Sequence, residues 1–330
     1  MGITVHITED FEAMSALAAE IAVRRIRMVL EKKPEAVLGL ATGNTPTGLY
    51  KRLARAANEG EFDPGRCRSF NLDEYVGLPG GNAQQRTMHP ESYAFFMIQE
   101  LFSLLKRKFA SSEVPYGALV DQKRLVSELK SHPGDWHELG TDRGRSIVIN
   151  RAPASEYLGW IKKEILGGYA ARIMKAGGID LQIIGVGGKG HVAFHESGIP
   201  FKGSSMMLVK LDENTVNNAV ADGHFTSVKD SPRYAISMGA ELVYRARTVL
   251  LLANGERKVE PVARSLLEAP SPEVPISYGQ VYAARGGELI YVLDRIAGRE
   301  LLVHEKTLRA RGITLKVEEP PAAAGTARAV

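Results

Sequence analysis

The chain has 330 residues, of which 44% are hydrophobic and 24% charged, a balance typical of folded globular proteins that excludes extensive disorder. The net charge of +4 comes from interleaved signs, and without a clustered basic face or a recognisable motif no nucleic acid is expected as a partner. The single cysteine, Cys67, excludes a disulfide framework and predicts a reducing, cytoplasmic location. No apolar run reaches the length of a membrane span and the N-terminus lacks an apolar signal core, so no membrane association is expected.

Strands and helices alternate along most of the sequence. The predicted elements, in chain order, are a helix over 10–31, a strand over 36–41, a helix over 47–57, a strand over 68–72, helices over 91–109 and 156–175, strands over 179–185, 207–211 and 234–238, a helix over 240–245, a strand over 248–253, a helix beginning near Lys258 and a strand over 289–293. This alternation favours a parallel or mixed sheet covered on both faces.

The pattern is weaker in two places. Residues 110–155 are rich in Ser, Gly, Pro, Asp and His, and we interpret them as a long insertion or small subdomain. The tail over 318–330 contains a Pro-Pro-Ala-Ala-Ala-Gly run and is expected to be disordered. The remaining residues, 1–317, are interpreted as a single α/β domain.

The first candidate site is the turn over 42–46, Thr-Gly-Asn-Thr-Pro, between a predicted strand and a predicted helix. Free N–H groups and the dipole at a helix start favour an anion, and the hydroxyls of Thr42 and Thr45 can donate hydrogen bonds. The Gly-Lys-Ser/Thr ending of a nucleotide-binding P-loop is absent. From these residues alone, a phosphate site and an ordinary capped turn are about equally supported.

Two other strand ends carry charged side chains. Asp73 and Glu74 follow the strand over 68–72, where a partly buried carboxylate could act as a general base. A solvated pair that opens a turn is the favoured interpretation from the local sequence alone. Lys258 lies at a predicted helix start, which is unfavourable for a cation unless an anion binds there; a surface lysine is the alternative.

The richest loop is the glycine-rich segment over 185–196. It contains G-x-G-x-x-G after a strand, but no helical pattern opens at Gly190, which argues against a dinucleotide site. The spacing of His191, His195 and Glu196 differs from zinc-binding motifs and no third ligand can be named, so no metal is expected. We favour a turn that exposes a histidine and a glutamate for acid–base chemistry.

These four loops all follow strands. Because the carboxyl ends of parallel strands meet at one edge of a sheet, the loops are expected to converge on one crevice. The crevice would hold an anion cradle, a carboxylate, a His–Glu pair and a lysine. That combination suits proton shuttling on a phosphorylated small molecule.

Four segments in order, LGLATGNTPTGLY over 38–50, NLDEYVGL over 71–78, HPESY over 89–93 and GVGGKGHVAFHE over 185–196, resemble the glucosamine-6-phosphate deaminase (isomerase) family. The resemblance extends from about residue 35 to about 295. NLDEY, HPESY and the Phe-His-Glu of 194–196 favour the deaminases over the related 6-phosphogluconolactonases. The resemblance implies a Rossmann-like, three-layer α/β sandwich with a mostly parallel central sheet.

The resemblance also implies roles for individual residues. Asp73 would take the C2 proton of an amino-sugar 6-phosphate and return it at C1, and His191, paired with Glu196, would assist ring opening. Water would then release fructose 6-phosphate and ammonia, with no metal or organic cofactor. The implied substrate-binding residues are Thr42, Gly43, Asn44, Thr45, Glu74 and Lys258. A homo-oligomer is compatible with the family.

The sequence departs from the family pattern near the histidine. Lys189 stands where the family usually has an aspartate that raises the imidazole pKa, so like-charge repulsion is expected to lower it. The segment over 212–221 lacks the family's arginines, and Lys189 is a candidate to replace their charge at the phosphate. Two alternatives to an active deaminase follow: a catalytically weakened sugar-phosphate sensor, and a 6-phosphogluconolactonase-like hydrolase.

Overall fold

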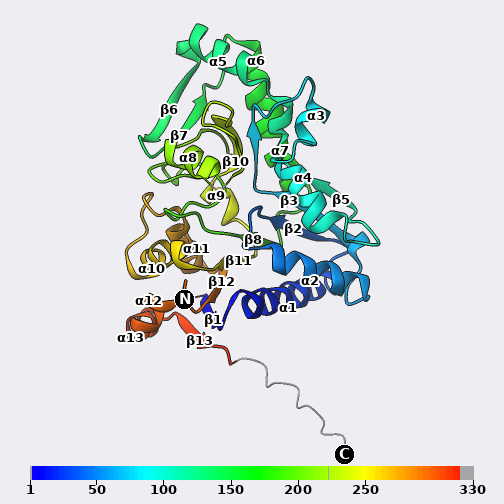
Figure 1. Cartoon of the computed structure of the whole chain (residues 1–330), viewed down its shortest axis with the longest axis vertical. Helices are drawn as coiled ribbons and strands as arrows, with labels where there is room; N and C mark the ends of the chain where they lie inside the picture. Colours follow the sequence, from blue (N-terminus) through cyan, green and yellow to red (C-terminus); the bar gives the residue numbers. More distant parts are fainter. Residues whose placement is uncertain (1, 222, 320–330) are drawn as a thin grey trace, which may run out of the picture.

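The computed structural model describes residues 2–221 and 223–319. Its largest element is an eight-stranded sheet with the order β13-β1-β12-β11-β8-β2-β3-β5, and every neighbouring pair of its strands is parallel (Figure 1). The strands are β1 (Ile3–Thr8), β2 (Ala36–Leu40), β3 (Cys67–Asn71), β5 (Ser111–Glu113), β8 (Leu181–Ile184), β11 (Thr248–Ala253), β12 (Glu288–Asp294) and β13 (Thr314–Val317). The predicted parallel sheet is confirmed, with β1, β5 and β13 as strands that the sequence analysis missed.

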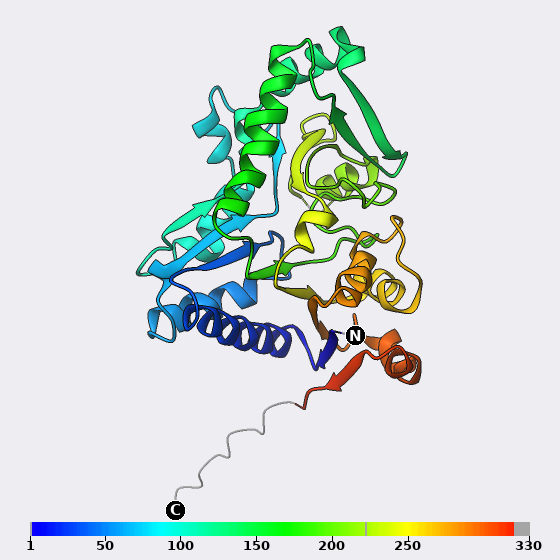
Figure 2. The same ribbon diagram turned by 180° about the vertical axis from the view of Figure 1, so that it is seen from behind.

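Helices cover both faces of this sheet. The helices are α1 (Phe11–Leu30), α2 (Thr47–Asn58), α3 (Ala83–Thr87), α4 (Tyr93–Met97), α5 (Gln122–Ser131), α6 (Glu156–Trp160), α7 (Gly168–Lys175), α8 (Glu213–Ala221), α9 (Ala240–Val243), α10 (Val259–Leu267), α11 (Tyr278–Ala284), α12 (Arg299–Val303) and α13 (Glu305–Ala310). A wide-turned segment, Ile161–Gly167, joins α6 to α7, so one long helix fills the predicted range 156–175; it is the long green helix of Figure 2.

The sheet has an apolar core on each face because successive strand residues point to opposite sides. Ile183 belongs to the core beneath α1 and α2, whereas its neighbour Ile184 belongs to the core that includes α7, α9, α10 and α11. The result is the predicted three-layer sandwich. Asp10 caps α1 by accepting a hydrogen bond from the backbone N–H of Ala13 at 2.8 Å, which fits the helix start expected at residue 10.

A second sheet of five strands, in the order β4-β10-β9-β7-β6, was not predicted. All its neighbouring pairs are antiparallel. Its strands are β4 (Asp73–Val76), β6 (Trp136–Thr141), β7 (Gly144–Ile149), β9 (Met206–Lys210) and β10 (Tyr234–Met238). The strands expected over 207–211 and 234–238 therefore exist but pair in this sheet, because a short apolar run does not encode its partner strand.

The helix expected over 91–109 is shorter than predicted. It consists of α4 and a wide turn, Ile98–Phe102. Beyond it, the ammonium group of Lys108 donates to the carbonyl oxygens of Phe102 at 2.8 Å and Leu105 at 2.6 Å. This satisfies carbonyl groups at the helix end, so the apolar residues up to 109 need not continue the helix.

The segment over 110–155 contributes to both sheets. It supplies β5 at the edge of the large sheet and the β6–β7 hairpin at the edge of the small one, with α5 between them. Of the C-terminal tail, Glu318 is held to β1 by its backbone N–H, which donates to Ile7 at 2.8 Å. The disorder predicted for the rest of the tail falls on 320–330, outside the described residues.

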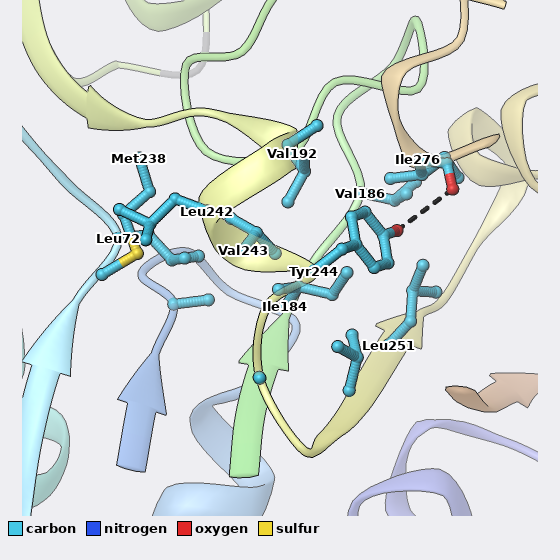
Figure 3. Packing of buried hydrophobic residues seen from close by; sticks show 14 of the residues in the cluster. Leu72, Ile184, Val186, Val192, Met238, Leu242, Val243, Tyr244, Leu251 and Ile276 are labelled. Carbon is cyan, nitrogen blue, oxygen red and sulfur yellow. Dashed lines mark hydrogen bonds between the residues drawn. The ribbon is translucent and has the colours of Figure 1, made fainter. Parts of the chain in front are cut away.

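The core continues directly beneath the loops at the carboxyl edge of the large sheet. Figure 3 shows Val186 and Val192, from the loop after β8, in one cluster with Ile184 and Leu251 of the sheet. The hydroxyl of Tyr244 donates to the carbonyl of Ile276 at 3.0 Å inside the same cluster. The apolar residues of the glycine-rich loop thus anchor it to the core.

Candidate active site

The four candidate loops follow β2, β3, β8 and β11, which are adjacent, parallel strands in the sheet. Their carboxyl ends share one edge, and a cavity of about 770 Å³ opens there. The cavity is lined by Thr42, Gly43, Asn44, Thr45, Asp73, His191 and Lys258, together with other residues of the same loops. The structure therefore brings the carboxylate of residue 73 and the imidazole of residue 191 to one cavity.

One end of the cavity is built from the turn before α2 and the turn after β11. Gly43 has a φ of +108°, a conformation that favours glycine. The hydroxyl of Thr45 donates to the side-chain oxygen of Asn254 at 2.8 Å and so joins the two turns. Among the described residues that line the cavity, the arginine is Arg257 and the lysine is Lys258. A helix start and two cations together favour an anion at this end.

Asp73 is the first residue of β4 and is only 5% exposed. No described residue donates a hydrogen bond to its carboxylate. Burial, and then the charge of Glu74, raises its pKa well above the usual range. A carboxylate with a raised pKa that faces a cavity is a stronger proton acceptor than an ordinary surface aspartate, which suits a general base.

His191 lies in a tight loop that only glycine permits. A side chain at Gly187 would place its Cβ 1.9 Å from the imidazole Nε2 of His191, and Gly190 has a φ of +83°. The backbone N–H of Gly187 donates to the carbonyl of His191 at 3.0 Å. Burial, and then the charge of Lys258, lowers the pKa of His191 to about 4, so its imidazole is neutral at pH 7.

Glu74 is turned away from the cavity. Its carboxylate accepts hydrogen bonds from the hydroxyl of Ser92 and from the backbone N–H groups of Tyr75, Tyr93 and Ala94, at the start of α4. It is 1% exposed and is absent from the cavity lining. The structure therefore gives Glu74 a role in holding α4 rather than a contact with a ligand.

Glu196 and His195 also point into the protein. The carboxylate of Glu196 accepts from the backbone N–H of Asp212 at 2.6 Å and from the hydroxyl of Thr215, and none of the described contacts joins it to His191. Burial raises its pKa to about 7. His195 accepts from the backbone N–H of Ala240 at Nδ1, so its Nε2 is the atom that donates to the carbonyl of Ile199.

Lys189 lies outside the cavity lining. Its ammonium group is 3.5 Å from a carboxylate oxygen of Asp212, so the two side chains form an ion pair. The expected like-charge effect is present, since Lys189 contributes to the lowered pKa of His191, but burial and Lys258 contribute more. Among the described residues, no group of three or more His, Cys, Asp and Glu side chains could hold a metal ion.

Comparison with known proteins identifies the family. The chain is 32% identical over 295 residues to a glucosamine-6-phosphate deaminase of Clostridium perfringens, a match that covers 89% of this chain and 98% of the relative. It is 33% identical over 295 residues to a glucosamine-6-phosphate deaminase of Rhodopirellula baltica, with 89% and 94% covered. The chain belongs to the glucosamine-6-phosphate deaminase family. No family model matches the chain.

Solved structures agree with this membership of the deaminase family. A monomeric glucosamine-6-phosphate deaminase matches with a TM-score of 0.66 and 26% identity over 89% of this chain and 99% of the other. A 6-phosphogluconolactonase of Thermotoga maritima, at 18% identity and a TM-score of 0.56 over 88% and 99% of the two chains, shares the fold. In the described part of the chain, no helix is both long and apolar enough to span a membrane.

The sequence analysis missed several residues of this deaminase-family site. Arg257 adjoins Lys258 and could have been inferred from that position. Tyr93 and Phe194 also line the cavity, and their rings lie 5.8 Å apart and nearly parallel, which offers apolar surface to a ligand. His224 lines it too and contacts Glu91 at 2.8 Å; no pattern in the sequence indicated that contact.

Proposed function

We propose that this protein converts glucosamine 6-phosphate and water to fructose 6-phosphate and ammonia. The observation that carries the proposal is the placement of Asp73 and His191 in one cavity, with a cationic, anion-favouring end at the turns before α2 and α10. Membership of the deaminase family supports the same substrate and reaction. Thr42, Gly43, Asn44, Thr45 and Lys258 would hold the phosphate, and Arg257 lies beside them.

The first step is opening of the sugar ring. The neutral imidazole of His191 accepts the proton of the C1 hydroxyl and delivers a proton to the ring oxygen, which breaks the bond between C1 and that oxygen. The lowered pKa of His191 keeps the imidazole free to accept this proton at neutral pH and makes the imidazolium a strong acid for the second transfer.

The remaining steps move a proton from C2 to C1 and another from the amine to the C1 oxygen, and then release the amine. The Asp73 carboxylate removes the proton at C2 while the C1 oxygen gains a proton, which converts the open-chain amino aldehyde to an enolamine. Asp73 then returns its proton at C1 and the amine loses one proton, which gives a ketose imine. Water then adds at C2 and the bond to nitrogen breaks, giving the ketose and ammonia. Burial of Asp73 raises its pKa, so the same group can take up the proton and give it back.

An ammonia-release assay with glucosamine 6-phosphate tests this proposal. We expect turnover by the wild type, and a loss of at least about a thousandfold in Asp73→Asn, because general acid–base groups contribute roughly that much. Asp142→Asn is the matched control, since the carboxylate of Asp142 is 96% exposed on the β6–β7 hairpin. Absence of ammonia from wild-type protein that still binds the sugar phosphate would favour the sensor alternative and overturn the proposal.

An assay of the same variant with 6-phosphogluconolactone tests the lactonase alternative. Hydrolysis of a lactone needs no base for a carbon-bound proton, so a hydrolase would keep its activity on 6-phosphogluconolactone in Asp73→Asn.

We also propose a cytoplasmic location, because a doubly charged sugar phosphate does not cross a lipid bilayer unaided.

A further inference from the structure

An ion pair joins the loop that carries His191 to the residue before α8. The ammonium group of Lys189 is 3.5 Å from Asp212 Oδ2. The Asp212 side chain is 7% exposed and that of Lys189 is 48% exposed. Lys189 is two residues before His191, and Asp212 immediately precedes α8, so the pair joins two segments that are far apart in the sequence.

Glu196 reinforces the same junction from the other end of the loop. Its carboxylate accepts hydrogen bonds from the backbone N–H of Asp212 and from the hydroxyl of Thr215 in the first turn of α8. The hydroxyl of Ser197 donates to the carbonyl of Lys189 at 3.4 Å and closes the loop on itself. The loop that presents His191 is therefore fastened to the start of α8 on both sides of the histidine.

The charges that act on the imidazole come from several elements. Lys258 and Lys189 oppose its protonation, and so does His195 to a smaller extent, whereas Asp212 is the carboxylate that favours it. Lys189 adds a cation where the resemblance to the family leads one to expect an aspartate. Asp212 lies against that cation and offsets it from a different element of the fold.

We propose that Asp212 is a positioning residue for His191: through its ion pair with Lys189, it holds the histidine loop against α8 and supplies negative charge to the imidazole. Lys189 links Asp212 to the loop that carries the histidine. The kinetic consequences rest on the proposed deaminase function, but the contact and its effect on His191 do not.

Three variants test the pair by kinetics: Asp212→Asn, Lys189→Met and the double variant. Asp212→Asn leaves the lysine charge beside His191 without its counter-charge, so we expect kcat to fall about tenfold with KM changed less than about twofold. Lys189→Met removes that charge, so the double variant should recover the part of the lost kcat that the uncompensated charge causes. Glu213→Gln, an exposed carboxylate one residue further on, is the matched control and should leave kcat unchanged.

A proton NMR titration of His191 in the ligand-free protein gives a readout that does not need turnover. We expect the pKa of His191 to rise in Lys189→Met and to fall in Asp212→Asn. If these shifts occur but the wild type makes no ammonia, the proposed function fails and the pair stands. If Lys189→Met leaves the pKa of His191 unchanged, or the double variant is no more active than Asp212→Asn, the inference is wrong. Should Asp212→Asn not fold, the Lys189→Met titration decides alone.

Discussion

Substitution of Glu74 tests whether the buried hydrogen bonds of this residue, rather than its position beside Asp73, determine its role at the site. It adjoins the proposed base Asp73, yet its carboxylate accepts from the Ser92 hydroxyl at 2.8 Å and from the backbone N–H groups of Tyr75 at 2.9 Å, Tyr93 at 3.1 Å and Ala94 at 3.1 Å. Replacing Glu74 should therefore change stability far more than substrate affinity.

The geometry predicts different costs for two substitutions. Glu74→Ala leaves the buried N–H groups of Tyr75 and Tyr93 without an acceptor, whereas Ala94 keeps its bond to the Ser92 hydroxyl. Each unpaired buried donor costs about 1–3 kcal/mol, and the truncated side chain adds a cavity, so we expect a loss of about 3–6 kcal/mol in the free energy of unfolding. Glu74→Gln keeps an oxygen for both N–H groups and should lose less than about 2 kcal/mol.

Urea unfolding followed by circular dichroism measures these losses, and Glu61→Gln, at an exposed glutamate, serves as the control. Ammonia release well below the melting temperature then gives KM, which should stay within about twofold of the wild type in Glu74→Gln. A Glu74→Gln protein as stable as the wild type, but with KM raised tenfold or more, would show that Glu74 binds substrate and would refute the reasoning.

Three further outcomes follow from the same structure. Gly187→Ala should reduce kcat by roughly a hundredfold through the collision with His191, because small misplacements of catalytic groups cost about that much; Gly188→Ala, which has no atom within 4 Å of the added Cβ, should be near wild type, and equal activities would contradict the packing argument. Burial lowers the pKa of His195 from 6.5 to about 4, so neutral His195 stabilises the fold above pH 6.5, and up to about 3 kcal/mol is lost as the pH falls through 4. Urea unfolding at several pH values should show a shallower loss in His195→Gln, and an unchanged slope would exclude this histidine as its source. Cys67 is 0% exposed with its pKa raised by burial to about 12, so iodoacetamide should label it only after unfolding; mass spectrometry of native protein at pH 7 would detect the contrary.

Local patterns in the sequence were sufficient for five of the eight strands of the large sheet and for the loops at its edge. The strands β2, β8 and β11 are short apolar runs; Gly185 follows β8, Asn254 follows β11, and β3 ends at Asn71. These signals act over a few residues. Because parallel strands align their carboxyl ends, the sequence alone assigns four loops to one crevice. Asp73, His191, Thr42 to Thr45 and Lys258 were found in this way, and all of them line the cavity.

The directions of neighbouring side chains could not be obtained in the same way. Asp73 and Glu74 are consecutive in β4, so their side chains point to opposite faces, and only the packing of α4 decides that Glu74 is the one turned inward. Likewise Glu196, five residues after His191, contacts the start of α8 instead of the imidazole. The short separation in the sequence predicted that His191 and Glu196 form a pair, but in the folded protein Glu196 contacts Asp212 instead.

By itself, then, the amino-acid sequence determined which residue types end each strand of the large sheet and hence which side chains could gather at its edge. Only the tertiary structure decided that β9 and β10 pair in a separate antiparallel sheet and that Lys189 meets Asp212. The physical reason is range: propensity, turns and periodicity depend on residues a few positions apart, whereas strand partners and buried ion pairs depend on which distant segments pack together most favourably.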